Sequence, residues 1–88
     1  MKKYQVLFSN LAAKELRHLP KEEIKRVYTK AKDLETDPRP SGCKKLVGEK
    51  ENIWRVRVGD YRIVYTINDE ILIVDIRRIG NRRDVYNK

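Results

Sequence analysis

The segment 53–67 alternates between apolar and mostly polar or basic side chains, and this period of two constrains the fold more than any other feature of the chain. Successive side chains of a β-strand point to opposite faces, so the alternation predicts strands with one buried face. Gly59-Asp60 interrupts the segment as a two-residue turn signal and predicts a β-hairpin. Asn68-Asp69 is a second turn signal, and a further strand is expected over about residues 71–78.

The first turn sets the register of the hairpin. If Gly59-Asp60 is the whole loop, Arg57 lies directly opposite Arg62, and Arg55 lies one residue pair further along the same face. Like charges opposed across two strands, with side-chain bases about 5 Å apart, destabilise a sheet. A protein tolerates such a pair more readily when a negative group binds between its members.

The second turn predicts how the next strand joins the sheet. With Asn68-Asp69 as the whole loop, the expected core pairs are Tyr65 with Leu72, Ile63 with Val74, and Tyr61 with Ile76. The same register places Arg62 opposite Asp75 on the outer face, with Arg77 nearby. Asp75 would then neutralise part of the charge of Arg62.

The N-terminal half predicts one strand and two helices. Residues 4–8 alternate as a strand, and Ser9 is a plausible N-cap for a helix that Pro20 ends. Pro20 can also open a second helix, whose apolar stripe runs until Asp37-Pro38. Residues 41–52 are expected to form a loop. The resulting β-α-α-β-β-β order predicts an α+β fold, a small antiparallel-rich sheet covered by a helical hairpin.

Length and composition limit the kinds of site and partner. A chain of 88 residues predicts a single domain, residues 1–88, too small for a deep enclosed cavity, so any site is expected to be an open face. The net charge of +8 implies an acidic partner such as nucleic acid. No apolar run approaches the roughly 20 residues that span a bilayer, so no membrane partner is expected. The single cysteine, Cys43, and the single histidine, His18, predict no disulfide, metal site or cofactor and fit the cytoplasm.

The outward positions of the predicted strands favour phosphate binding. Lys and Glu would serve solubility equally well, yet the positions are all arginine: Arg55, Arg57, Arg62 and Arg77. The planar guanidinium makes bidentate contacts with phosphate and stacks on bases. RNA is therefore the expected ligand, with Lys44, Lys45, Arg77 and Arg83 as additional RNA-binding residues.

Two motifs resemble a known family. The run IWRVRVGDYRIVYTI over residues 53–67 resembles the core of the RelE branch of RelE/ParE toxins. The tail IGNRRDVY over residues 79–86 resembles the closing glycine, basic pair and near-terminal tyrosine of that family, and the KKLVG stretch and the helical hairpin also fit. The resemblance implies a RelE-like fold and the toxin of a type II toxin–antitoxin pair. Such a toxin enters the ribosomal A site, cuts mRNA and is held by a RelB-like antitoxin.

The resemblance also implies roles for single residues. Arg62 matches the strand arginine, Arg82 the arginine after the C-terminal glycine, and Tyr86 the catalytic or base-stacking tyrosine. Arg55 and Arg57 stand where the best-known relative has two lysines. Arginine, unlike lysine, does not lose its proton near neutral pH, so neither residue supplies an obvious general base.

The expected reaction is metal-independent cleavage through attack of the RNA 2′-hydroxyl on the adjacent phosphate. Arg62 and Arg82 would stabilise the developing charge, Arg55 and Arg57 would orient the phosphate, and Tyr86 would stack on a base or assist proton transfer. Three alternatives remain: a ParE-like toxin that inhibits DNA gyrase, a non-catalytic nucleic-acid-binding module, and a family member that has lost its activity.

Overall fold

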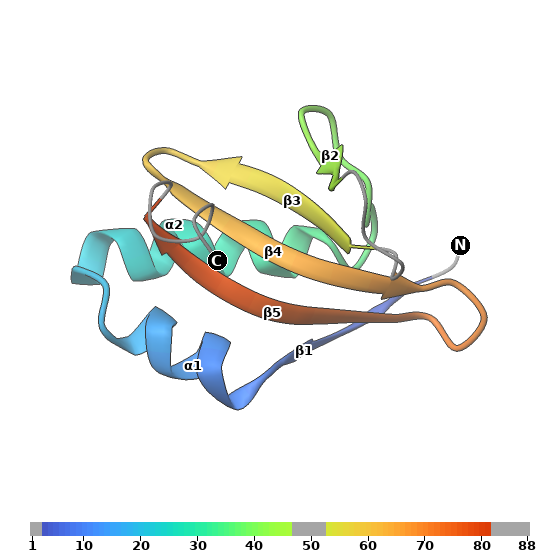
Figure 1. The fold of residues 1–88 in the computed structure, drawn as a ribbon, viewed down its shortest axis with the longest axis horizontal. Coiled ribbons are helices and arrows are strands. Elements are labelled where there is room, and N and C mark those ends of the chain that lie inside the picture. The colour runs from blue at the N-terminus through green and yellow to red at the C-terminus, as the bar shows by residue number, and fades with distance from the viewer. Residues whose placement is uncertain (1–2, 47–52, 82–88) are drawn as a thin grey trace.

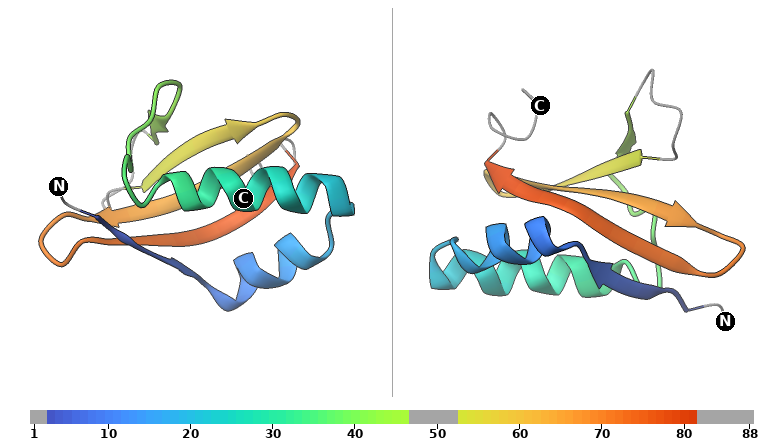
Figure 2. Two further views of the ribbon diagram at one scale, coloured as in Figure 1. Left: turned by 180° about the vertical axis from the view of Figure 1, so that it is seen from behind. Right: turned by 60° about the horizontal axis from the view of Figure 1, so that its bottom comes forward.

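A five-stranded mixed sheet with both helices on one face forms the framework of the molecule (Figures 1 and 2). The structure, a computed structural model, describes residues 3–46 and 53–81. Its elements are β1 (Gln5–Phe8), α1 (Asn10–Arg17), α2 (Lys21–Asp33), β2 (Lys44–Lys45), β3 (Ile53–Val58), β4 (Tyr61–Asn68) and β5 (Ile73–Asn81). The strand order is β1-β5-β4-β3-β2, with β1 parallel to β5 and the other neighbours antiparallel. The predicted α+β fold is confirmed.

The helical hairpin begins and ends close to the predicted residues. Ser9 is the N-cap of α1, because its Oγ accepts a hydrogen bond from the backbone N–H of Ala12 at 3.0 Å. Pro20 is the N-cap of α2. The helix α2 ends at Asp33, before the predicted Asp37, because hydrogen-bonded turns replace the helical pattern there. Within the described residues, no helix is long and apolar enough to cross a membrane.

The core lies between the helices and the inner face of the sheet. Its fully buried side chains from the two layers include Val27, Ala31 and Leu34 of the α2 region, and Ile63, Tyr65, Val74, Ile76 and Ile79 of the strands. The hydroxyl of Tyr65 donates a hydrogen bond to the backbone oxygen of Pro38 at 2.8 Å, so its polar end is satisfied inside the core. This hydrogen bond also ties the segment after α2 to the middle of the sheet.

The β3–β4 hairpin has the predicted register. Val58 pairs with Tyr61 and Arg57 pairs with Arg62 across the two-residue turn. Gly59 has a φ of +60°, a conformation that this tight turn requires and that glycine adopts without a steric penalty. The basic side chains of β3 and β4 therefore share the face of the sheet that lies opposite the helices.

The predicted register of β4 against β5 is wrong. Asn68 pairs with Ile73, so four residues, 69–72, separate the strands instead of two. Asn68 Oδ1 accepts hydrogen bonds from the backbone N–H groups of Glu70 and Ile71 at 3.0 and 3.2 Å, and Leu72 adopts a positive φ of 56°. The asparagine side chain thus organises a longer turn than the dipeptide signal suggested.

This longer turn and a bulge change the neighbours of Arg62. Asp75 pairs with Thr66, and Arg62 pairs with Gly80, so the predicted pairing of Arg62 with Asp75 is wrong. The register shifts by one residue between Val64 and Tyr65, where Arg77 is the extra residue on β5. Since side chains alternate along a strand, the shift restores an apolar residue, Ile79, to the core opposite Ile63.

Residues 41–46 include a short strand that the sequence reading assigned to a loop. Lys44 pairs with Arg55 and Lys45 pairs with Trp54, which makes β2 a two-residue addition at the edge of β3. A strand of two residues is too short to show an alternating pattern in the sequence. It forms because it pairs with β3. The remainder of the predicted loop, residues 47–52, lies outside the described residues.

Candidate functional site

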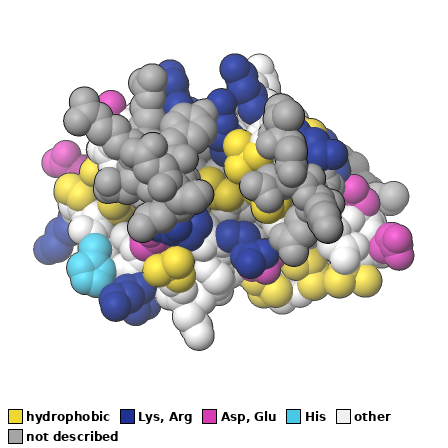
Figure 3. Space-filling view, viewed as in Figure 1, with side chains coloured by type: hydrophobic (Ala, Val, Ile, Leu, Met, Phe, Trp, Pro, Cys, Tyr) yellow, Lys and Arg dark blue, Asp and Glu magenta, His cyan; other side chains and the backbone are white. Residues whose placement is uncertain are grey.

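A basic hollow lies on the sheet face opposite the helices. It has a volume of about 330 Å³ and is lined by Gly42, Lys44, Arg55, Arg57 and Arg62. Lys and Arg side chains also recur across the middle and upper part of the molecule in Figure 3, whereas most visible Asp and Glu lie towards its two ends. We call this hollow the arginine hollow. The described residues that line it include four cations and no acid.

The two opposed arginines of the arginine hollow differ in exposure. Arg57 is exposed, whereas Arg62 is only 3% exposed although its side chain lies on the sheet face away from the helices. Buried charges are costly to desolvate, and the surrounding structure holds them in defined positions. Arg62 is therefore a fixed cation at the floor of the hollow, and Arg57 is a more accessible cation across from it. An anion bound between them would relieve their mutual repulsion.

The predicted site residues divide into three groups. The structure brings together Arg55, Arg57, Arg62 and Lys44. Lys45 pairs with Trp54 and so shares the opposite face of the sheet, while Arg77 is exposed at the β5 bulge and does not line the hollow. The predictions for Arg82, Arg83 and Tyr86 lie outside the described residues.

A network of side chains that sequence reasoning missed joins the N-terminus, the segment after α2 and the β4–β5 turn. Asp69 in the β4–β5 turn accepts a hydrogen bond from the Tyr4 hydroxyl at 2.6 Å. The same carboxylate receives two hydrogen bonds from the Arg39 guanidinium, at 3.2 and 2.9 Å. Arg39 also lies 5.1 Å from the centre of the Trp54 ring, a cation–π distance. These residues form what we call the Asp69 clasp.

The Asp69 clasp shifts the titration of its members. The hydrogen bond from the Tyr4 hydroxyl to Asp69 raises the pKa of Tyr4. The hydrogen bonds from the guanidinium to Asp69 likewise raise the pKa of Arg39. The clasp anchors the segment that follows α2, three residues before Gly42 of the hollow. No sequence signal links these residues, because Tyr4 and Asp69 are 65 positions apart.

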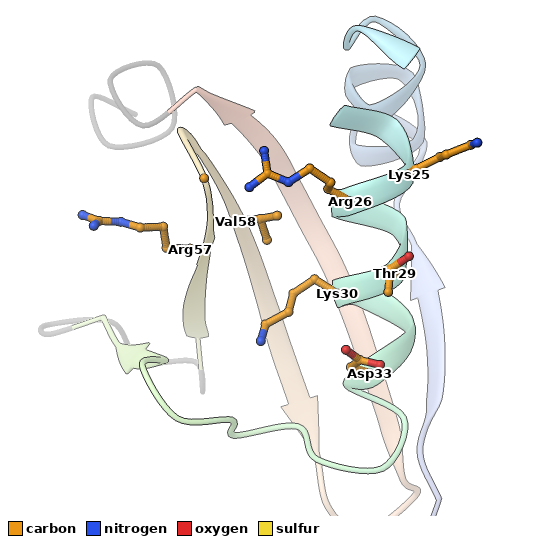
Figure 4. A pocket seen from close by; sticks show the side chains of 8 residues that line it. Lys25, Arg26, Thr29, Lys30, Asp33, Arg57 and Val58 are labelled. Atoms are coloured by element: carbon orange, nitrogen blue, oxygen red, sulfur yellow. The ribbon is translucent and has the colours of Figure 1, made fainter. Parts of the chain in front are cut away.

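A second basic hollow separates α2 from β3 (Figure 4). Its volume is about 440 Å³ and its lining residues are Lys25, Arg26, Thr29, Lys30, Asp33, Arg57, Val58 and Gly59. We call it the α2 groove. The sequence predicted the apolar stripe of this helix and assigned no site to its other side.

His18 and the potential metal ligands of the described residues lie apart from the arginine hollow. His18 is exposed at the C-cap of α1, where its Nδ1 lies 2.7 Å from the backbone oxygen of Lys14. Over residues 3–46 and 53–81, no three His, Cys, Asp or Glu side chains gather as a metal site would require. The chemistry that the described residues offer is thus the binding and charge stabilisation of an anion.

Comparison with known proteins places the chain in a family. Residues 6–86 match the model of the ParE toxin of the type II toxin–antitoxin system, parDE. The chain is also 35% identical over 86 residues to Toxin RelG of Mycobacterium tuberculosis, with 97% of this chain and 98% of that protein covered. The chain belongs to the RelE family of type II toxins.

Solved structures agree with this assignment to the RelE family. The archaeal RelE–RelB complex from Pyrococcus horikoshii matches with a TM-score of 0.80 and 30% identity, covering 93% of this chain and 97% of that chain. The isolated RelE toxin of E. coli matches with a TM-score of 0.76 and 27% identity, covering 96% of this chain and 92% of that chain. The resemblance seen in the two sequence motifs therefore extends to the whole fold of a RelE-family toxin.

Proposed function

We propose that this RelE-family toxin, acting as a single domain over residues 1–88, is a ribosome-dependent endoribonuclease that cleaves mRNA in the A site and inhibits translation. The observation that carries the proposal is the opposed pair Arg57 and Arg62 in a hollow whose charged lining residues, among those that the structure describes, are cations. An RNA phosphate that enters this hollow meets guanidinium groups from two strands. Preorganised cations of this kind stabilise the charge that develops on a phosphate during cleavage.

The proposed reaction needs no metal ion. The 2′-oxygen of one nucleotide attacks the adjacent phosphorus as the bond from phosphorus to the 5′-oxygen breaks. The 2′-hydroxyl loses its proton and the departing 5′-oxygen gains one, so the products are a 2′,3′-cyclic phosphate and a 5′-hydroxyl. Arg62 and Arg82 stabilise the charge on the phosphate, and Arg55 and Arg57 orient it. Tyr86 stacks on a base or assists proton transfer; Arg82 and Tyr86 are assigned from their sequence motif.

The identity of the basic residues explains the proposed dependence on the ribosome. Arg55 and Arg57 replace residue types that can accept a proton, and arginine keeps its charge at neutral pH. Positioning and electrostatic stabilisation must then supply most of the rate, with a smaller contribution from acid–base catalysis. The ribosome would contribute by aligning the attacking hydroxyl with the leaving group.

The proposed partner of the toxin is a RelB-like antitoxin. A RelE-family relative from P. horikoshii was solved as a RelE–RelB complex, and it covers 93% of this chain. The net charge of +8 favours an acidic partner, since opposite charges accelerate and strengthen association. We propose that such a partner keeps the toxin from RNA until the complex dissociates.

A second candidate function is inhibition of DNA gyrase without catalysis. The family model that matches residues 6–86 carries the ParE description, which favours this reading. A gyrase inhibitor would not need opposed arginines in an open basic hollow. The arginine hollow therefore favours RNA cleavage over the ParE-like alternative.

One experiment separates the two candidates. The protein is added to a translation extract, and the 5′ ends of ribosome-bound mRNA are mapped for the wild type, Arg62→Gln and Arg82→Ala. We expect cuts within A-site codons for the wild type and their loss in both variants. Lys14→Gln removes one exposed charge from α1 and serves as the matched control, which should still cut. Intact mRNA together with blocked DNA supercoiling would instead identify the gyrase inhibitor.

A further inference from the structure

The α2 groove has the character of an anion-binding surface. Arg26 and Lys30 reach from α2 towards β3, whereas Lys25 extends away from the strand (Figure 4). Asp33, the one acid among the described residues that line the groove, lies at the end of α2 away from Arg26. The described lining next to the β3–β4 turn is therefore cationic, with Glu23 of α2 paired to Arg26 behind it.

The α2 groove and the arginine hollow are two parts of one basic surface. Arg57 lines both of them. The strand β2 pairs only with Trp54 and Arg55, so the described part of the chain leaves the last residues of β3 without a strand neighbour on that side. Basic side chains consequently continue from the outer face of the sheet, around the edge of β3, to α2.

The cation nearest the turn is held in place. Arg26 Nη1 lies 3.1 Å from Glu23 Oε1, and the two form an ion pair one turn apart on α2. A Cβ built on Gly59 would lie only 2.9 Å from Arg26 Nη2, so the guanidinium packs directly against the glycine backbone. Because Gly59 already needs a positive φ, this glycine both forms the turn and leaves room for Arg26.

We propose that the α2 groove binds the phosphodiester backbone of RNA that continues beyond the phosphate held in the arginine hollow. This inference rests on the proposed function and extends it to a second contact site. A small anion would occupy only one hollow, whereas a polymer with a regular charge spacing engages both through Arg57. The groove presents Arg26, Lys30 and the Thr29 hydroxyl, which suit backbone contacts that do not depend on base sequence.

The occupant is the single-stranded mRNA beside the cleavage position, because that strand continues from the phosphate in the arginine hollow past Arg57. Structured ribosomal RNA is the alternative occupant that the test must exclude. The probes are fluorescent 2′-O-methyl oligonucleotides of about 3 and about 12 nucleotides, which bind phosphate sites but lack the attacking hydroxyl. A third probe is the purified small ribosomal subunit without mRNA.

The variant Arg26→Gln/Lys30→Gln removes two charges from the α2 groove while keeping side-chain length and helix propensity. Its matched control, Lys14→Gln/Arg17→Gln, removes two exposed charges from α1. For the groove variant, we expect unchanged binding of the short oligonucleotide and about tenfold weaker binding of the long one. The slope of log affinity against log salt should fall by about 1.4 for the long oligonucleotide, because two phosphate contacts are lost.

The outcomes separate the two proposals. Weaker binding of the long oligonucleotide supports mRNA as the occupant. Weaker binding of the subunit alone would overturn this occupant in favour of ribosomal RNA. Equal binding of both probes by the groove variant and the control would overturn the groove while leaving the proposed function intact. Absence of RNA binding by the wild type would overturn both. A polyglutamate peptide that loses affinity for the groove variant, with RNA binding unchanged, would reassign the groove to an acidic protein.

Discussion

At the scale of single residues, Arg57 and Arg62 show a conflict between stability and ligand binding. The two are directly paired across β3 and β4, where like charges lower stability. Arg62 is buried and Arg57 is exposed, so water screens the repulsion only in part. A phosphate that lies between the two guanidinium groups would contact both and offset this repulsion.

The variant Arg57→Gln tests this conflict. We expect the free energy of unfolding to stay constant or to rise by up to about 0.5 kcal/mol, because a like-charge pair is removed. Binding of the short 2′-O-methyl oligonucleotide should weaken about tenfold in the same variant. Urea denaturation and fluorescence anisotropy measure the two quantities. A loss of stability above about 1 kcal/mol would show that Arg57 supports the fold instead of the ligand.

Tyr65 carries the clearest pH dependence among the described residues. Burial is the main cause that raises its pKa above the ordinary value of 10.0, since the ionised phenol would lie inside the core. The stabilising effect of the neutral phenol is complete below the unfolded-state pKa and is lost as the pH rises through the higher folded-state pKa. Wild-type stability should therefore decline above about pH 10, and Tyr65→Phe should decline less. Urea midpoints that fall equally in both proteins would contradict this assignment.

At the scale of elements, two side-chain contacts hold strands that lack a full set of backbone partners. The strand β1 pairs with β5 only over Ile73–Ile76. Beyond Ile76, a side chain of α1 supplies a partner for the backbone of β5. Glu15 Oε1 accepts a hydrogen bond from the backbone N–H of Ile79 at 2.8 Å. The Glu15 carboxylate also pairs with the Arg78 guanidinium at 2.9 Å. The helix α1 is thereby fixed to the C-terminal half of β5, where Gly80 pairs with Arg62 of β4.

Substitutions of Glu15 separate these two contacts. Glu15→Gln keeps an acceptor for the Ile79 N–H and loses the ion pair, so we expect a cost of about 0.5–1 kcal/mol. Glu15→Ala leaves the N–H of a buried residue without that acceptor and should cost about 1–3 kcal/mol. Urea denaturation gives the two costs, and hydrogen exchange at the Ile79 amide should accelerate most in the alanine variant. Equal effects of the two substitutions would show that the ion pair, and not the backbone contact, holds β5.

The Asp69 clasp is the second contact at this scale. Its ion pair with Arg39 is partly exposed, with side-chain exposures of 37% and 51%, so screening limits its contribution. Asp69→Ala should cost about 1 kcal/mol and should also weaken binding of the short oligonucleotide, because the segment that leads to Gly42 and Lys44 loses its anchor. Glu70→Ala, in the same turn, is the matched control and should change neither quantity. Normal oligonucleotide binding by Asp69→Ala would show that the clasp does not position the residues of the arginine hollow.

The sequence predicted the parts of the site that depend on short-range rules. A two-residue turn leaves one register for β3 and β4, so the opposition of Arg57 and Arg62 was predictable. The β4–β5 register was not, since the Asn68 side chain extends the turn and a bulge shifts the pairing. The Asp69 clasp joins residues far apart in sequence. The α2 groove was missed because cations on a helix surface look the same whether they face solvent or a neighbouring strand.

At the scale of the whole molecule, positive charge surrounds one edge of the sheet. The outer face contributes the arginine hollow, and the helix side contributes the α2 groove, with Arg57 common to both. A chain with a net charge of +8 and such a continuous surface is suited to a long polyanion. The same surface needs an inhibitor when the toxin is not in use, which agrees with the proposed RelB-like antitoxin.

The central claim is that the arginine hollow cleaves mRNA that the ribosome has aligned. Its most direct test is the single-turnover rate of cleavage of one mRNA, free in solution and bound to programmed ribosomes with an open A site. We predict 5′-hydroxyl and 2′,3′-cyclic phosphate ends, a rate at least about 100-fold higher on the ribosome, and a further loss of about 10²–10³-fold for Arg62→Gln. Equal rates on free and ribosome-bound mRNA, or an Arg62→Gln variant as fast as the wild type, would contradict the account.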